Sequence, residues 1–239
     1  MADQTSGAAP GRDRVLAAVR ETRDDAAPFA LAAGAILVLL ALLSLHAHWD
    51  LLGRRMWWIW LIVAAPYILL WATLLFGLGT ILRSERRREL VIAILALVWA
   101  ATFAGVVVLV ASLVAHSGSH ITGRQLLVSG AAVWLTDAIA FGLAYWELDN
   151  GGPVTRALAE RRDTPDFQFP QDENPELART PWAPRLWDYF YISITNSIAF
   201  SPTDAMPLTR PAKVLMASES GLAAITVLLV AARAVNILA

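Results

Sequence analysis

LVIAILALVWAATFAGVVVLVASLVA, residues 90–115, carries no charged side chain over its whole length. A helix of about 20 apolar residues is long enough to cross a hydrocarbon core roughly 30 Å thick. Comparable apolar stretches recur along the chain at residues 29–45, 57–82, 125–147 and 214–238. The sequence therefore predicts an all-α fold, a polytopic membrane bundle of five transmembrane helices.

The composition agrees with a membrane protein and excludes several other classes. The chain has 239 residues, of which 57% are hydrophobic and 16% are charged, whereas soluble domains carry about 25% charged residues. Its net charge of −1 gives no basis for binding nucleic acid, and it contains no cysteine for disulfides or thiolate sites. Hydrolase, kinase and dinucleotide-binding motifs are missing, so we expect neither an enzyme nor a cofactor.

Four regions follow from the alternation of polar and apolar segments. Residues 1–27 form a polar N-terminal tail, and residues 28–147 contain the first four spans. Residues 148–186 form a charged, proline-rich linker, and residues 187–239 contain a short apolar segment and the last span. Pro28 fits the first turn of the first span. Pro66 lies inside the second span and predicts a kink.

The arginines predict the orientation of the chain, because Lys and Arg in short loops favour the cytoplasm. They are concentrated in the tail, in the second loop and in the linker, and five spans place these three regions on one side. The opposite loops carry only Arg54, Arg55 and Arg124. We therefore expect a cytoplasmic N-terminus and a cytoplasmic linker.

The stretch WDYFYISITNSIAFSPTDAMPLT, residues 187–209, differs from the five spans. Residues 187–198 are apolar enough to enter a membrane but too few to cross it, and a polar stretch with Pro202 and Pro207 follows. This order predicts a re-entrant segment, a short helix over 187–198 and a non-helical turn over 199–206. Pro211 fits the first turn of the last helix.

The same stretch resembles the pore module of potassium channels over residues 187–238. In that family a pore helix with Tyr-Phe leads to a Thr-Val-Gly-Tyr-Gly filter, an Asp, a Pro-x-Thr and an inner helix. Here Tyr189-Phe190, Asp204, Pro207-Leu208-Thr209 and Ala212-Lys213 match that order, and Gly221 stands where inner helices carry a hinge glycine. The filter-like positions are Thr195, Asn196, Ser197, Ile198, Ala199, Phe200 and Ser201.

The resemblance implies a passive ion channel, a homo-oligomer such as a tetramer, and an inorganic cation as the permeant species. Ala199 and Ser201 replace the two filter glycines, whose backbone freedom a residue with a Cβ lacks. Pro202 and Thr203 are additional residues before Asp204. The filter is thus degenerate and the potassium selectivity of the family is not expected. The arginine distribution also turns this module toward the cytoplasm.

A second resemblance covers more of the chain. Five-span bacterial membrane proteins of unknown function have an arginine-rich second loop, a linker similar to Asp-Phe-x-x-Pro and a Tyr-Phe re-entrant segment before the last helix. This chain has Asp166-Phe167-Gln168-Phe169-Pro170 in its linker. The resemblance implies a multi-pass protein of the bacterial inner membrane, embedded in the lipid bilayer. It implies no activity, so a non-conducting structural or transporter-like protein stays open beside the channel.

Two acids fall within predicted spans, Asp137 in the fourth and Glu219 in the fifth. A carboxylate at the centre of a membrane costs roughly 2.5–3.5 kcal/mol on insertion scales, so both should face the bundle interior or water. Asp137 is a candidate proton or cation site, and the alternative is a neutral, hydrogen-bonded acid that holds two helices together. Glu219 is a candidate pore-lining acid, and the alternative is that it reaches back to Lys213 or to neighbouring backbone.

The four histidines occur in two loops, as His46 and His48, and as His116 and His120. Five spans place both loops on the same side of the membrane. Imidazoles at this spacing are weak candidates for binding zinc or copper. The alternative is that they are polar loop residues, and no metal is expected.

Overall fold

The computed structural model describes seven segments of the chain: residues 12–47, 57–75, 84–115, 123–159, 165–178, 182–201 and 204–238. Nearly all of them are helical, which confirms the all-α prediction. The five long helices are α1 (Arg12–His46), α2 (Trp58–Leu75), α4 (Ser84–Ala115), α5 (Gly123–Leu148) and α9 (Arg210–Leu238).

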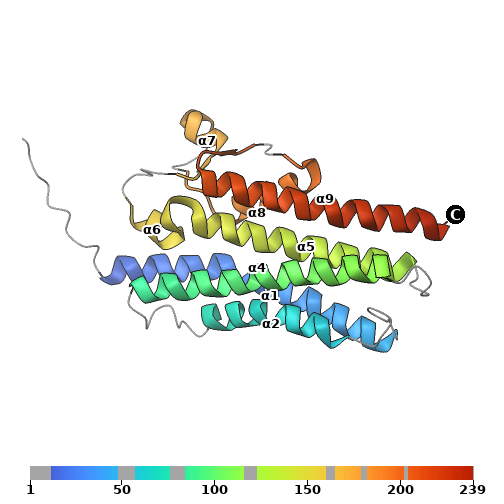
Figure 1. Ribbon diagram of the computed structural model, residues 1–239. Helices are drawn as coiled ribbons and strands as arrows, with labels where there is room; N and C mark the ends of the chain where they lie inside the picture. The colour runs from blue at the N-terminus through green and yellow to red at the C-terminus, as the bar shows by residue number, and fades with distance from the viewer. Residues whose placement is uncertain are drawn as a thin grey trace, which may run out of the picture.

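The long helices form an elongated bundle in which α1, α2, α4 and α5 run antiparallel in turn (Figure 1). The starts of α1, α4 and α9 and the end of α5 gather at one end, which we name the linker end. The described segments that flank the arginine-rich tail, second loop and linker thus lie at one end of the bundle. At the other end lie the end of α1, the start of α2 and the C-terminus.

Three of these helices are long and apolar enough to cross a membrane, by length and composition. They comprise Asp13–His46, Leu127–Gly151 and Arg210–Ala232. Trp58–Ala72 and Ile92–Val108 are shorter apolar helices. Side chains such as Leu39, Ile62 and Leu228 are more than half exposed on the outside of the bundle. An outer surface of this kind suits lipid better than water, and together with the three long apolar helices it fits a membrane protein.

The helices match the apolar stretches, with differences at their ends. α5 extends the predicted 125–147 by two residues at its start and one at its end, and α4 begins six residues early with the arginines of the second loop. The predicted 57–82 span is helical to Leu75, and residues 76–83 lie outside the described segments. Pro66 lies inside α2, as predicted.

The prediction that Pro28 begins a helix is wrong, because α1 runs unbroken from Arg12 through this residue. A proline inside a helix leaves the carbonyl four residues earlier without its usual donor. That carbonyl belongs to Asp24, and both residues lie on the exposed face of α1, where water can replace the donor. Ala18 and Ala26 are buried, so the N-terminal part of α1 packs against the protein as the rest does.

The linker contains folded structure in its described part. It begins with the 3₁₀ turn η1 (Asp149–Gly151) and α6 (Pro153–Leu158), and continues with β1 (Phe167–Gln168), α7 (Pro170–Glu173) and η2 (Pro175–Leu177). β1 pairs antiparallel with β2 (Met206–Pro207), with Phe167 opposite Pro207 and Gln168 opposite Met206. This short ladder is the one sheet within the described segments, and it ties the linker to the residues that precede α9.

The short helix α8 (Leu186–Ala199) confirms the predicted helix over 187–198, with one more residue at each end. Ala199 was assigned to the turn and is instead the last helical residue. α8 starts at the linker end and runs beside α5 and α9 toward the middle of the bundle (Figure 1). The non-helical chain then returns to the linker end, where β2 and the start of α9 follow. Pro211 occupies the first turn of α9, as predicted.

α8 buries polar as well as apolar side chains. Its buried face carries Leu186, Tyr189 and Ile192 together with Ser193, Asn196 and Ser197, whereas Trp187 and Ile198 are 68% and 62% exposed. A helix on a water-soluble protein normally buries its apolar face. The buried hydroxyl and amide groups of α8 require polar partners inside the bundle, and its exposed apolar side chains suit an apolar environment outside it.

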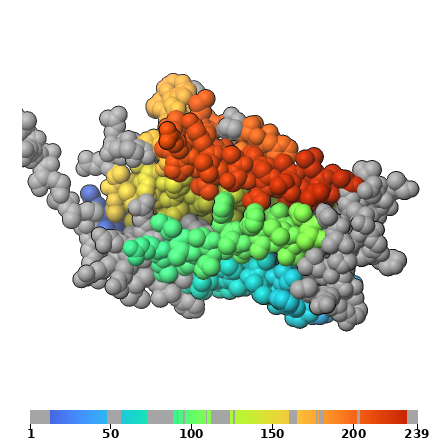
Figure 2. Space-filling model, in the orientation of Figure 1, coloured from blue at the N-terminus to red at the C-terminus, as the bar shows by residue number. Residues whose placement is uncertain are grey.

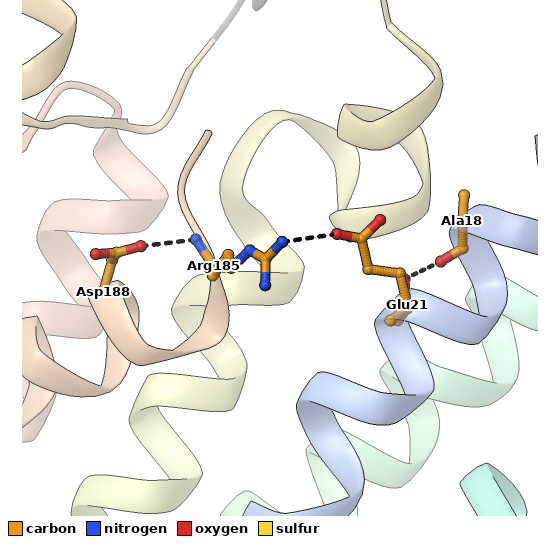
Figure 3. Close-up of polar contacts among 5 residues, drawn as sticks. Ala18, Glu21, Arg185 and Asp188 are labelled. Atoms are coloured by element: carbon orange, nitrogen blue, oxygen red, sulfur yellow. Dashed lines mark hydrogen bonds and ion pairs between the residues drawn. The ribbon is translucent and has the colours of Figure 1, made fainter. Parts of the chain in front are cut away.

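The start of α8 is fixed against α1. The ring of Phe29 packs edge-on against the rings of Trp187 and Phe190, with centroids 5.0 Å apart in each case. Figure 3 shows Arg185 between the two helices: its guanidinium lies 3.4 Å from Glu21, and its backbone N–H donates to Asp188 at 2.7 Å. These contacts set the position at which the chain enters the bundle.

α9 lies at the edge of the bundle, beside α4 on the face seen in Figure 2. Only 22% of the apolar segment of this helix is buried inside the protein. The buried remainder includes Glu219 and Ala223, which are covered by the rest of the bundle. α9 therefore contributes little to the core apart from one narrow inward stripe.

The close approach of α5 and α8 provides a test of this arrangement. A Cβ added at Gly142 would lie 3.1 Å from the Phe190 Cα, so we expect Gly142→Ala to lower the free energy of unfolding by about 1–3 kcal/mol. Gly221→Ala is the matched control, because a Cβ there meets nothing within 4 Å. Thermal unfolding in detergent compares the variants, and equal melting of both would contradict the packing of α8 on α5.

Candidate functional site

The side chain of Glu219 lies at the meeting point of α5, α8 and α9 and is completely buried. Three side chains contact its carboxyl group. The Tyr145 hydroxyl donates to Oε2 at 2.5 Å, Asn196 Nδ2 donates to the same oxygen at 2.6 Å, and Ser193 Oγ lies against Oε1. We name these four residues the Glu219 cluster.

The two α8 members of the cluster make further bonds that fix their positions. Asn196 Nδ2 also donates to the Met216 carbonyl at 3.0 Å, and Asn196 Oδ1 accepts from the Ser220 hydroxyl at 3.1 Å. Ser193 Oγ lies 2.7 Å from the carbonyl oxygen of Ala138 on α5. The polar face of α8 is thus bonded to both neighbouring helices.

Asp137 of α5, the second predicted acid, is 3% exposed and lies close enough to Glu219 for the two carboxyl groups to interact electrostatically. Within the described part of the chain its Oδ1 has no hydrogen-bond partner. No cationic side chain of the described residues pairs with either acid. The structure therefore brings both predicted intramembrane acids together, without a compensating cationic side chain among the described residues.

A second group of hydroxyls lies on the other side of Asp137. The buried Tyr67 of α2 donates to the Thr136 carbonyl at 3.1 Å and shares a 2.5 Å hydrogen bond with Thr102 of α4. Tyr67 also interacts electrostatically with Asp137. Buried polar groups thus occur on α8, α9, α5, α2 and α4, within a bundle whose core is mainly apolar.

The residues predicted to form a filter do not share one conformation. Thr195, Asn196, Ser197, Ile198 and Ala199 belong to the last turns of α8 and therefore lack the extended backbone of a filter. Asn196 and Ser197 are buried, whereas Ile198, Ala199, Phe200 and Ser201 are exposed. Phe200 ends the helix in the left-handed conformation, with φ of 54°.

Asp204 lies on the return segment, apart from the buried cluster. It is exposed and lines a cavity of about 180 Å³, together with Asp188, Tyr191 and Gln171. Burial raises the pKa of the Asp188 carboxyl above its ordinary value, although hydrogen bonding and charge from Arg185 oppose this shift. The described residues hold no group of three His, Asp or Glu side chains that could bind a metal.

The remaining predicted positions are less informative. Gly221 lies within the continuous helix α9, on its exposed side. His46 is the last residue of α1. His48, His116 and His120 lie outside the described residues, so the histidine prediction stays a prediction.

Sequence reasoning missed a junction of two carboxyl groups at the linker end. Asp149 is completely buried, and its Oδ1 accepts from the backbone N–H groups of Asp166 and Phe167 at 2.7 and 3.2 Å. Its Oδ2 accepts from the Tyr189 hydroxyl at 2.5 Å. Asp166 in turn accepts from the Thr209 hydroxyl at 2.5 Å. The junction joins the end of α5, the linker, α8 and the start of α9.

The Arg156 guanidinium closes this junction. Its Nη1 donates to the carbonyls of Trp146 and Asp149 at 2.7 and 2.5 Å, and its Cζ lies 5.1 Å from the centroid of the Tyr189 ring. Cations stabilise the carbonyl end of a helix. The only sequence signal for the junction was the Asp-Phe motif of the linker, which indicated an architecture and no contact.

Comparisons of the chain with protein-family models, with curated proteins and with solved structures find no match.

The junction can be tested on two tyrosines of the same helix. Tyr189→Phe removes the bond to the buried Asp149, so we expect a loss of about 1–2 kcal/mol in the free energy of unfolding. Tyr191 is 53% exposed, so Tyr191→Phe should change this free energy by less than about 0.5 kcal/mol. Denaturant unfolding in detergent measures both, and a Tyr189→Phe protein as stable as Tyr191→Phe would remove the junction from the account of the fold.

Proposed function

We propose that this chain is a five-span membrane protein through which ions cross the bilayer, with the Glu219 cluster as its ion site. The observation that carries the proposal is the complete burial of Glu219 among neutral donors, with Asp137 beside it. Acids inside membrane segments are rare because they are costly, and they mark ion pathways and proton relays. Burying two neighbouring acids costs free energy, and none of the described residues offers them a cationic partner. A purely structural role would not require such a pair.

The path of α8 supports this proposal. α8 enters beside α9, ends in the middle of the bundle and is followed by a non-helical return to the same end. In a membrane, such a backbone is tolerated where protein shields it or where it lines a wet cavity. We infer that α8 and the return segment form a re-entrant hairpin, as in the channel family that this stretch resembles.

The proposed setting is the inner membrane of a bacterium, with the N-terminus and the linker in the cytoplasm. The resemblance to channels also implies a homo-oligomer, for example a tetramer. The exposed apolar residues at the tip of α8, Ile198 and Phe200, are available for contacts between subunits. An inorganic cation is the permeant species that the resemblance implies.

One observation favours a second candidate, a non-conducting or transporter-like bundle. The buried polar groups of α8 are bonded within a single chain, to the neighbouring helices α5 and α9. A packed hairpin of this kind needs no pore. The two candidates differ in whether the purified protein passes ions.

Labelling of single cysteines tests the proposed topology in this cysteine-free chain. We expect a cysteine at Ser119 to react with an impermeant thiol reagent in intact cells, and a cysteine at Ser84 to react only after lysis. The reason is the concentration of arginine on the side of residue 84. Reaction at residue 84 but not at residue 119 would reverse the orientation and place α8 on the outer side.

Vesicles reconstituted with the purified protein test ion passage, with potassium, sodium and proton gradients applied in turn. We expect the wild type to dissipate at least one gradient, and Asp137→Asn to reduce that flux toward the leak of protein-free vesicles, because the charge is lost while the shape is kept. Asp13→Asn, on the exposed start of α1, is the matched control. Wild-type vesicles as tight as empty ones would eliminate ion passage and leave the non-conducting candidate.

A further inference from the structure

We propose that the ion held by the Glu219 cluster is a proton, bound to Oε1 of Glu219 and hydrogen-bonded to Ser193. This inference rests on the proposed function, because it names the ion that uses the site. It follows from a count of hydrogen-bond donors and acceptors around one buried carboxyl group.

The Ser193 hydroxyl has a single hydrogen to donate. Its oxygen lies within hydrogen-bond distance of the Ala138 carbonyl oxygen and of Glu219 Oε1. The carbonyl can only accept. An ionised carboxylate can also only accept, so one hydrogen would have to serve two acceptors. The contact that received no hydrogen would then be a close approach of two bare oxygens.

A protonated Glu219 removes this conflict. The Oε1–H group donates to Ser193 Oγ, and Ser193 donates to the Ala138 carbonyl. Glu219 Oε2 continues to accept from Tyr145 and from Asn196. Every group in the cluster then has a role that its chemistry allows, which is how buried polar networks are normally satisfied.

The charges around the site agree with a bound proton. From α5 the titratable groups that face Glu219 are Tyr145 and Asp137. The α8 residues that contact Glu219 are Ser193 and Asn196, and neither side chain titrates. The charged residues of α4 are confined to 85–89 at its start. Among the described residues this site is surrounded by neutral donors and a second acid, with no cation to balance a buried carboxylate, and a proton provides that balance.

Release of the proton has a structural consequence. The O–H bond of Glu219 breaks, the electron pair stays on Oε1, and the proton passes to a water molecule, which leaves as hydronium. Oε1 then needs a donor. Ser193 can supply it only by turning its hydrogen away from the Ala138 carbonyl, which removes a bond between α8 and α5. Proton occupancy is thus coupled to the attachment of the re-entrant helix.

Glu219→Gln is the central test, because the glutamine amide imitates the protonated acid. Its NH₂ donates to Ser193 and its oxygen accepts from Tyr145 and Asn196, so we expect the variant to fold and melt as the wild type does. The full-length protein in lipid vesicles is compared with the variant by infrared spectroscopy. The wild-type-minus-variant difference should contain the C=O stretch of a carboxylic acid, with a shift in heavy water.

Glu89→Gln, an exposed position at the start of α4, is the matched control and should leave that band in place. Ser193→Ala is a second variant, in which the band should move to higher frequency because the acid loses its acceptor. A difference spectrum that shows only a carboxylate at Glu219 would overturn the proton assignment, as would a band unaffected by Ser193→Ala.

Proton flux in the same vesicles separates this inference from the proposed function. We expect Glu219→Gln to lose the proton flux of the wild type down to the leak of protein-free vesicles. An acid band without any ion flux would refute the proposed function while the proton site stands. Wild-type proton flux in Glu219→Gln would overturn the inference and leave ion passage by another route.

Discussion

A carboxyl group that is completely withdrawn from solvent must find its hydrogen-bond donors inside the protein, and Glu219 imposes this requirement on the C-terminal half of the chain. α5 supplies one donor through Tyr145. Its other partners, Asn196 and Ser193, come from α8, which therefore carries polar side chains on its inner face and apolar side chains such as Ile198 on its outer face. A helix with that distribution, only 14 residues long, cannot replace a transmembrane span, so the chain has to turn back beside it.

The return of the chain raises a second requirement, since backbone outside a helix needs partners of its own. Asp149 and Asp166 satisfy much of it at the linker end, where their carboxyl groups accept from backbone N–H groups and from hydroxyls of α8 and of the α9 start. The β1–β2 ladder and the bond from the Leu208 N–H to the Asp166 carbonyl at 2.8 Å continue this support. The linker is thus the structure that holds α8 and α9 in register, rather than a mere connection.

The sequence was sufficient for features that depend on local patterns. Runs of apolar residues located the long helices, and the prolines at 202, 207 and 211 located the end of α8 and the start of α9. It failed where distant segments decide the outcome. Nothing near Pro28 shows that α1 continues through it, and nothing near Asp149 or Tyr189 shows that they meet across 40 residues. Asp137 and Glu219 were each predicted as buried acids, but their proximity depends on the relative register of α5 and α9.

The structure differs from the potassium-channel pattern in the position of its polar groups. A filter recognises a dehydrated cation with carbonyl oxygens of an extended, glycine-rich backbone. In the described residues that stretch is helical up to Ala199, and Phe200 adopts the left-handed angle that glycine usually provides. The polar groups instead project from the helical face of α8 toward a carboxyl group on α9. Carbonyl rings suit a cation that sheds its water, whereas a buried carboxyl group among neutral donors suits a proton, which needs one oxygen and no cage. The proposed proton site is therefore compatible with an order of elements that resembles channels, because the order of elements determines the path of the backbone and the side chains determine which ion they can bind.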